Sequence, residues 1–351
     1  MQIDLKYKSI SKTSETYFIA DIAANHDGNL QRAKELIFLA KEAGADCAKF
    51  QHFKAKEIVS RKGFQDLNQI NTHQSNWEKQ VDEIFDFYHT RTEWDSELLD
   101  ACNESEIEFM TTPYDIDAVR LYSKHCFGLK IGSGDITYHQ LIEEACKTKL
   151  PIFIATGAAD LFETERAVDI VRKHGNKFCL FQCNTNYTGE LENFKFLNLN
   201  VLKQFSCAFP EAILGLSDHT PGHAAVLGAV ALGARVIEKH FTDDNSRIGP
   251  DHKFALNPSS WREMVDHTRE LELALGDGIK RIEPNEKNTL IVQRRAIRAK
   301  RDINKGEVLT QDDLVFLRPC PANAYEPSEV GMILGQRLGQ AIVEGEAFEK
   351  K

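Results

Sequence analysis

The sequence predicts a closed (β/α)8 barrel, a TIM barrel, followed by a small β-rich domain. Eight short apolar or β-branched runs end in polar residues within the first three quarters of the 351-residue chain. Helical patterns separate several of them, and eight strand–helix alternations are what a closed parallel barrel requires. A doubly wound open sheet is the alternative, but no G-x-G-x-x-G follows the first run.

The eight predicted strands share an apolar body and a polar carboxyl end. They are Tyr17–Ala24, Cys47–Phe53, Phe109–Pro113, Leu129–Ser133, Pro151–Thr156, Phe178–Cys183, Ile213–Ser217 and Ala234–Phe241. Apolar residues at helical spacing predict helices between them. The predicted helices are Leu30–Ala43, Asp115–Lys124, His139–Thr148, Leu161–His174, the buried Gly222–Leu232 and the last, Pro258–Leu275.

The connection from Lys54 to Glu93 is longer than a tight turn requires. Such an insertion either covers a site or is a plain surface excursion. After the last helix the composition changes, which predicts a barrel over residues 1–278, a linker over 279–293 and a second domain over 294–351. Short strands are expected in that domain at Ala296–Ala299, Leu314–Leu317 and Gln340–Val343. About 60 residues are marginal for independent stability, so the domain is expected to rest on a partner surface.

Composition limits the class of protein. The net charge is −10 and no basic stripe occurs, which argues against nucleic acid as a partner. No run of eighteen apolar residues predicts a membrane span. The eight cysteines form no C-x-x-C pair and several lie in apolar runs, as expected of reduced thiols in a cytoplasmic protein.

Two histidines follow neighbouring predicted strands, at the point where each strand ends. His219 and His240 belong to one strand–helix–strand unit, and parallel strands joined in this way place their carboxyl ends side by side. Two imidazoles at that edge could share a divalent ion. The alternative is that each histidine only caps its strand through backbone hydrogen bonds.

Lysines inside barrel strands are costly unless they are paired. Lys49 and Lys130, with Ser133, Ser217 and Lys239 at other strand ends, are expected to form a cationic, hydroxyl-bearing pocket suited to phosphate and carboxylate. The alternative is that each lysine pairs with a barrel carboxylate. Asp21 and Asp135 are the two carboxylates proposed for that role, and the strand ends also supply Gln51, Thr185 and Tyr187.

The chain resembles the sialic acid synthase family. The motifs that carry this resemblance occur in the same order as in the family and extend over nearly the whole chain. They include Phe-Ile-Ala-Asp-Ile-Ala-Ala-Asn-His-Asp-Gly (18–28), Ala-Lys-Phe-Gln (48–51), Thr-Thr-Pro-Tyr (111–114), Leu-Lys-Ile-Gly-Ser-Gly-Asp (129–135), Gly-Leu-Ser-Asp-His-Thr (215–220), Glu-Lys-His-Phe-Thr (238–242) and Gly-Pro-Asp-His (249–252). The tail from Arg294 to Thr310 is similar to the antifreeze-like (SAF) domain of that family.

The resemblance implies an enzyme that condenses phosphoenolpyruvate with an acylamino sugar aldehyde, giving a nine-carbon 2-keto-3-deoxy acid and phosphate. It also implies a homodimer in which each SAF domain caps the partner's barrel. By motif, His219 and His240 match metal ligands, usually for Mn²⁺. The matches to phosphoenolpyruvate contacts are Lys49, Lys130, Ser133 and Ser217. The matches to acceptor-sugar contacts are Gln51, Tyr187, Asp251 and, from the neighbouring subunit, Arg318.

Several positions depart from the family pattern. Asp21 and Asp135 stand where the family usually has glutamate, and either could position or deprotonate the attacking water. Ala155 replaces a common serine, which removes one possible phosphate donor. The departures gather on the sugar side, so a diacetamido-dideoxy hexose is a plausible acceptor beside N-acetylmannosamine. The alternatives are a related enzyme that uses a sugar phosphate and a catalytically lapsed sugar-binding homologue.

Overall fold

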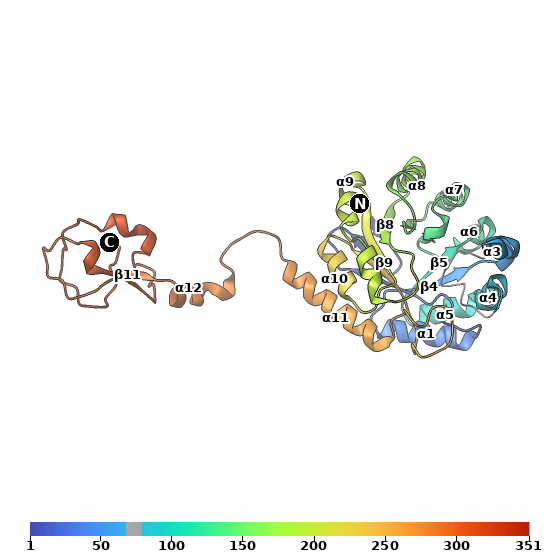
Figure 1. Cartoon of the computed structure of the whole chain (residues 1–351), viewed down its shortest axis with the longest axis horizontal. Coiled ribbons are helices and arrows are strands. Elements are labelled where there is room, and N and C mark those ends of the chain that lie inside the picture. The colour runs from blue at the N-terminus through green and yellow to red at the C-terminus, as the bar shows by residue number, and fades with distance from the viewer. Residues whose placement is uncertain (68–78, 351) are drawn as a thin grey trace. The chain divides into compact units, whose positions relative to one another are not determined.

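The chain forms two compact units, Met1–Gly276 and Asp277–Lys351, in a computed structural model that describes residues 1–67 and 79–350 (Figure 1). The division falls two residues before the boundary predicted after residue 278. Each unit has its own hydrophobic core.

The first unit is a closed barrel of eight parallel strands, as predicted. Each strand pairs with its neighbours in chain order, and β10 closes the ring against β3. The strands are Tyr17–Asp21 (β3), Cys47–His52 (β4), Glu108–Pro113 (β5), Leu129–Ile131 (β6), Ile152–Ala155 (β7), Phe178–Cys183 (β8), Ile213–Asp218 (β9) and Val236–His240 (β10).

Helices surround the barrel, and those at the predicted positions are confirmed within a few residues. The helices of this unit are Leu30–Glu42 (α1), Ala55–Ile58 (α2), Arg61–Asp66 (α3), Val81–Tyr88 (α4), Asp95–Glu104 (α5), Ile116–Tyr122 (α6), His139–Lys147 (α7), Leu161–His174 (α8), Val201–Ala208 (α9), Ala224–Ala231 (α10) and Pro258–Leu275 (α11). The first ends as expected, with Gly44 in the left-handed region at φ +97°.

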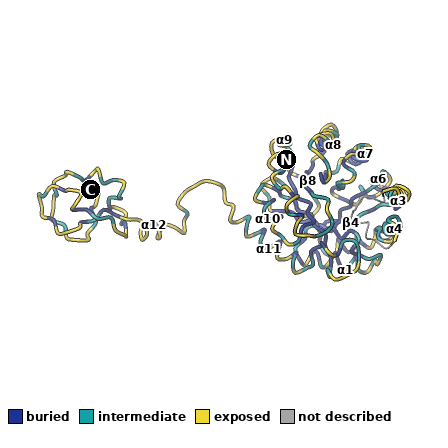
Figure 2. Tube along the Cα trace, viewed as in Figure 1, coloured by how far each residue is buried: buried dark blue, intermediate teal, exposed yellow. Residues whose placement is uncertain are grey.

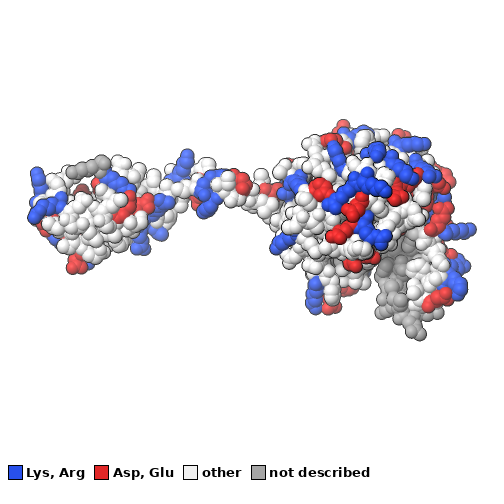
Figure 3. Space-filling model, turned by 90° about the horizontal axis from the view of Figure 1, so that it is seen from above, with Lys and Arg blue, Asp and Glu red and all other residues white. Residues whose placement is uncertain are grey.

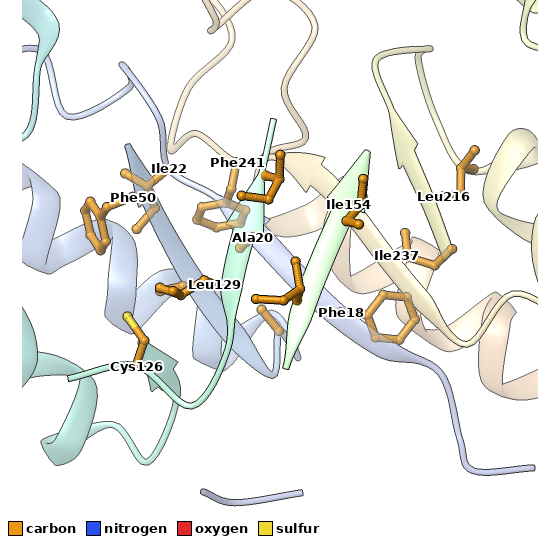
Figure 4. Packing of buried hydrophobic residues seen from close by; sticks show 14 of the residues in the cluster. Phe18, Ala20, Ile22, Phe50, Cys126, Leu129, Ile154, Leu216, Ile237 and Phe241 are labelled. Atoms are coloured by element: carbon orange, nitrogen blue, oxygen red, sulfur yellow. The ribbon is translucent and has the colours of Figure 1, made fainter. Parts of the chain in front are cut away.

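Side chains alternate between the two faces of each strand, because a strand has a side-chain period of two. Phe18, Ala20, Leu216 and Ile237 point outward and pack against the helices, as Figure 4 shows. The intervening residues point into the barrel, where a second cluster that includes Phe181 fills the interior. In Figure 2 the strands are accordingly buried, while the helices show exposed outer faces.

An N-terminal hairpin, which was not predicted, belongs to the barrel interior. Gln2–Asp4 (β1) pairs antiparallel with Ser9–Ser11 (β2), and their central residues Ile3 and Ile10 join the interior cluster. Each strand has only three residues, too few to reveal an alternating pattern in the sequence.

The second unit is small and largely irregular. The strands predicted at Ala296–Ala299 (β11) and Leu314–Leu317 (β12) are confirmed, and they pair antiparallel. The strand predicted at Gln340–Val343 is wrong, because only Ile342 forms an isolated bridge, to Ile303. The predicted linker contains a helix, Lys287–Gln293 (α12). The core of this unit consists of Ile297, Ala299, Ile303, Leu309, Leu314, Ile333 and Phe348.

Acidic and basic side chains are interspersed on the face of the barrel unit drawn in Figure 3. That face therefore shows no continuous basic stripe. Within residues 1–67 and 79–350, no helix is both long enough and apolar enough to cross a bilayer.

Gly215 of β9 tests how tightly the barrel interior is packed. A Cβ at this position would lie 2.7 Å from Phe181 Cδ1 and 2.9 Å from the Val236 carbonyl oxygen. We expect Gly215→Ala to lower the free energy of unfolding by about 1–3 kcal/mol through overpacking. Urea denaturation followed by tryptophan fluorescence measures this, because all three tryptophans precede residue 277.

Gly134→Ala is the matched control, since a Cβ there has no atom within 4 Å in the described structure and the φ of Gly134 is not in the left-handed region. It should change stability by less than about 0.5 kcal/mol. Equal losses in the two variants would contradict the tight packing at β9.

Candidate active site

A cavity of about 370 Å³ opens at the carboxyl ends of the barrel strands. Most of the side chains predicted from the sequence line it. They are Asp21, Lys49, Gln51, Lys130, Ser133, Tyr187, Ser217, His219, His240 and Asp251. The strand order explains their convergence, because parallel strands present all their carboxyl ends on one face of the barrel.

Lys49 lies at the centre of a polar group on β3, β4 and β5. Its ammonium donates hydrogen bonds to Asp21 Oδ2 at 2.8 Å and to Thr112 Oγ1 at 3.0 Å. Gln51 donates to the same Asp21 oxygen at 3.1 Å. The other oxygen, Asp21 Oδ1, is buried and has no hydrogen-bond partner among the described residues. Asp21 is therefore both the partner of Lys49 and an acceptor available to a ligand.

Lys130 is paired on the opposite side of the barrel, with a residue that the sequence analysis did not select. Its ammonium lies 2.6 Å from Glu238 Oε2, and Ser217 donates to Glu238 Oε1 at 3.2 Å. The expected alternative partner, Asp135, is not involved. The sequence did hold a signal for Glu238, because it precedes His240 by two residues in one strand and so shares its inward face.

Burial and pairing act in opposite directions on these carboxylates. Burial disfavours the charged form of Asp21, but Lys49 and then His240 outweigh it, so the pKa of Asp21 lies below its ordinary value. The pKa of Glu238 is lowered in the same way, against burial, by Lys130 and Lys49. Both carboxylates are therefore ionised at neutral pH.

The two predicted metal ligands lie together at the mouth of the cavity, with ring centroids 5.4 Å apart. Nδ1 of His219 is 3.0 Å from the Asn184 carbonyl oxygen, so this nitrogen carries the proton and Nε2 keeps its lone pair. Nδ1 of His240 is buried, has no hydrogen bond within the described residues and lies 3.7 Å from Asp251 Oδ2. Burial, and then His240, lowers the pKa of His219 to about 4.

These observations fit a divalent ion. The lowered pKa of His219 favours its neutral imidazole, and a backbone carbonyl fixes the tautomer. A buried ring nitrogen of His240 has no hydrogen-bond partner among the described residues. Tyr187 packs against His219 with ring centroids 4.4 Å apart, and Phe254 packs against His240 at 5.0 Å. The aromatic rings hold the two imidazoles in place.

The long connection after β4 forms an apolar wall of the cavity, so the described part of it covers the site. The lining residues from this connection and the end of β4 are Phe53, Ile58, Val59, Phe64, Ile84, Phe85 and Tyr88. They come from α2, α3 and α4 and the segments that join them. Residues 68–78 of the same connection lie outside the described residues.

Besides Lys239, three of the predicted site residues do not line the cavity. Asp135 lies beside it, with Oδ2 3.8 Å from where a Cβ on Gly132 would be, and burial raises the pKa of Asp135 to about 6. Thr185 Cγ2 lies 2.6 Å from where a Cβ on Gly157 would be. Arg318 is an exposed residue of the second unit.

The prediction that Lys239 contributes to the cationic pocket is wrong. It is fully buried on the outer face of β10, where it pairs with Asp218 and donates to the Thr220 carbonyl oxygen at 2.6 Å. Because side chains alternate along a strand, Lys239 faces the helices while Glu238 and His240 face the barrel interior. Lys239 therefore has a structural contact and no contact with the cavity.

The chain is similar to known proteins over most of its length. The chain matches the model of the NeuB family over residues 36–280 and that of the SAF domain over residues 294–350. It is 37% identical over 316 residues to N,N'-diacetyllegionaminic acid synthase of Campylobacter jejuni, covering 87% of this chain and 91% of that one. It is 31% identical over 336 residues to human N-acetylneuraminate-9-phosphate synthase, covering 95% and 91%.

A solved structure is similar over most of the chain. The N-acetylneuraminic acid (sialic acid) synthetase of Leptospira borgpetersenii superposes with a TM-score of 0.72 at 26% identity. The match covers 83% of this chain and 95% of that one.

The buried pair of Lys130 and Glu238 gives a stability prediction. Glu238→Leu leaves the ammonium of Lys130 buried without its partner, so we expect the free energy of unfolding to fall by about 3–5 kcal/mol. The double variant Lys130→Met/Glu238→Leu removes both charges and should recover most of that loss. Urea denaturation of the two variants measures the difference.

Lys147→Met is the control, because it breaks an exposed pair with Glu144 and should leave stability nearly unchanged. A double variant as unstable as Glu238→Leu alone would show that the loss comes from packing and not from the unpaired charge.

Proposed function

The chain belongs to the NeuB family and carries a SAF domain, and from this membership we propose that it is a nonulosonic acid synthase. The named relatives are sialic, legionaminic and pseudaminic acid synthases, which makes this a transferase-type enzyme. The proposed reaction joins phosphoenolpyruvate to an acylamino sugar aldehyde. The observation that carries the proposal is the convergence of two buried lysines, Lys49 and Lys130, and two histidines, His219 and His240, on one cavity.

The reaction balances with water as the third reactant. C3 of phosphoenolpyruvate forms a bond to the aldehyde carbon, whose oxygen takes a proton. Water adds to C2, which has become electron-poor. The resulting tetrahedral intermediate expels phosphate and leaves a 2-keto group. The products are a 2-keto-3-deoxy nine-carbon acid and inorganic phosphate.

Lys49 and Lys130 are suited to hold the carboxylate and phosphate of phosphoenolpyruvate. An ammonium has three N–H donors, and the hydrogen bonds of Lys130 to Glu238 and of Lys49 to Asp21 and Thr112 leave donor capacity for an anion. As negative charge moves onto the departing phosphate, fixed ammonium groups stabilise it without reorganising. Ser133 and Ser217 add hydroxyl groups to the same surface.

The charge of the cavity supports a requirement for a metal ion. Its lining carries two lysines and three carboxylates, those of Asp21, Glu238 and Asp251, so its formal charge is −1. A divalent ion on His219 and His240, for which we propose Mn²⁺, would make that charge +1 and would polarise the aldehyde oxygen of the acceptor. Anionic phosphoenolpyruvate would then enter a site of opposite sign.

Asp21 is the carboxylate best placed to orient the attacking water. Its Oδ1 is buried and has no hydrogen-bond partner among the described residues, and Lys49 and Gln51 hold the other oxygen. With its pKa lowered, the group is an acceptor at neutral pH and can align an O–H of the water toward itself. Asp135 does not line the cavity, so it is the weaker choice.

The wall from α2, α3 and α4 supports an acceptor with apolar substituents. Ile58, Val59, Phe64 and Ile84 offer no hydrogen bonds to hydroxyl groups, and they suit acetyl methyls or a deoxy position. Among the described residues, the lysines already assigned to phosphoenolpyruvate are the cations that line the cavity, so none is left there for a sugar phosphate. We therefore propose a diacetamido-dideoxy hexose as acceptor.

The assembly and the remaining contacts follow from the family resemblance. We propose a homodimer in which the SAF domain of one subunit caps the barrel of the other and Arg318 contacts the sugar. The lapsed-enzyme alternative predicts loss of the lysines or histidines, but all of them line the cavity. The sugar-phosphate alternative lacks a cation of its own in the described lining.

Phosphate release tests the proposed reaction. We expect the protein with Mn²⁺ to release phosphate from phosphoenolpyruvate only when a diacetamido-dideoxy hexose is present, with much slower release for N-acetylmannosamine and its 6-phosphate. His219→Ala and His240→Ala should each reduce the rate by at least about 100-fold through loss of the ion. Mass spectrometry of the product identifies the nine-carbon acid.

His125→Ala changes an exposed histidine outside the cavity and should retain the wild-type rate. If both histidine variants released phosphate at the wild-type rate, the proposed two-histidine metal site would be wrong. Release with a sugar phosphate alone would replace the proposed acceptor.

The apolar wall gives a prediction on selectivity. Ile84→Ser places a hydroxyl in the wall, and we expect the kcat/KM for the diacetamido-dideoxy acceptor to fall about 10–100-fold, mainly through KM. The KM for phosphoenolpyruvate should not change. Phe87→Ser, which alters an exposed residue of the same helix α4 that does not line the cavity, is the matched control. An unchanged kcat/KM in Ile84→Ser would show that the acceptor does not contact this wall.

A further inference from the structure

A second group of metal-ligating side chains lies in the outer helical layer, away from the cavity lining. His223 immediately precedes α10, and Glu263 and His267 are four residues apart on α11. Residues at this spacing share one face of a helix. Since α10 packs against α11, the face that carries Glu263 and His267 can meet His223 (Figure 1).

The ligand atoms of the three residues converge. One ring nitrogen of each histidine and one carboxylate oxygen lie within 4.8 Å of one another. Nε2 of His267 is 3.8 Å from Glu263 Oε1, and the two imidazole rings have centroids 4.8 Å apart. Zinc bonds of about 2.0–2.1 Å in a tetrahedron place neighbouring ligand atoms roughly 3.3 Å apart. The ligand atoms, which lie 3.8 Å apart for Glu263 and His267 and within 4.8 Å for the whole group, would therefore have to approach one another by roughly 0.5 to 1.5 Å.

A further carboxylate orients one of these imidazoles. Nδ1 of His267 lies 3.0 Å from Glu270 Oε2, one helical turn along α11. A hydrogen bond from Nδ1–H to this carboxylate leaves the lone pair on Nε2, the atom that faces Glu263. Carboxylates that accept from the second nitrogen of a ligating histidine are a regular feature of zinc sites.

Ion pairing of His267 with Glu263 and Glu270 would explain two of the contacts but not the position of His223. That imidazole packs against the ring of His267 at an interplanar angle of 37°, and one of its nitrogens lies near the other two ligand atoms. Two imidazoles and a carboxylate are the ligand set of many zinc sites that keep a fourth position open.

We propose that His223, Glu263 and His267 form a zinc site that joins the start of α10 to α11, distinct from the two-histidine site in the cavity. His223 and His267 are half-buried and Glu263 is exposed, so zinc reaches the site from solvent. The fourth position is open to water or to a ligand from another molecule. The site fixes the last barrel helix to its neighbour.

Zinc stoichiometry of the metal-free full-length protein tests the proposal. Equilibrium dialysis against ZnCl₂ is done on His219→Ala/His240→Ala, which removes the candidate site in the cavity. We expect one zinc per chain in this background. Adding His223→Ala or His267→Ala should remove it, and adding the near-isosteric Glu263→Gln should weaken zinc binding at least tenfold. Adding His125→Ala, an exposed histidine elsewhere, should leave it in place.

A second measurement does not depend on that background. In the otherwise wild-type chain, Glu263→Gln should lower the zinc-induced rise in melting temperature while phosphate release with Mn²⁺ is retained, because the residue lies outside the cavity. A background variant that takes up no zinc, or zinc uptake that is unchanged by His223→Ala and His267→Ala together, would overturn the proposal. Neither result bears on the proposed synthase activity.

Discussion

Two charged lysines inside a barrel need opposite charges beside them, and the site is arranged around that need. Lys49 pairs with Asp21 across β3 and β4, and Lys130 pairs with Glu238 across the barrel interior. Each pair is almost completely buried, so neither charge could be held there alone. Pairing fixes both ammonium groups in place, which in the proposed function prepares them for an anionic substrate.

Because of the same pairing, the lining of the cavity has no net positive charge. The carboxylates that stabilise the lysines in the folded protein also offset them electrostatically, and Asp251 adds a third negative charge. A dianionic or trianionic substrate therefore gains little from the protein alone. In the proposed mechanism, a divalent ion on the two imidazoles at the mouth would restore a positive site, which links substrate binding to metal binding.

The sequence predicted the parts of the fold and site that follow from strand period and topology. Parallel strands of a barrel have their carboxyl ends on one face. This rule was enough to predict that the ends of the eight strands, with Lys49, Lys130 and the two histidines, would lie together. Glu238 and Lys239 were misjudged for one reason. Adjacent residues of a strand face opposite sides, so the ammonium of Lys239 cannot belong to the pocket that Glu238 and His240 face. The hairpin of β1 and β2 is too short to show a pattern at all.

The apolar wall could not be predicted from the alternation and order of the strands, because it is formed by the connection after β4. Ile58, Val59 and Phe64 occur in short helical segments whose apolar residues have no regular period that would reveal which surface they cover. Their convergence depends on where the connection folds back over β4. In the proposed function, the lysines and carboxylates of the barrel floor bind the charged three-carbon substrate, whereas this wall determines which sugar fits above it. Selectivity for the acceptor can therefore change with the connection while the buried ion pairs, and the chemistry they support, stay as they are.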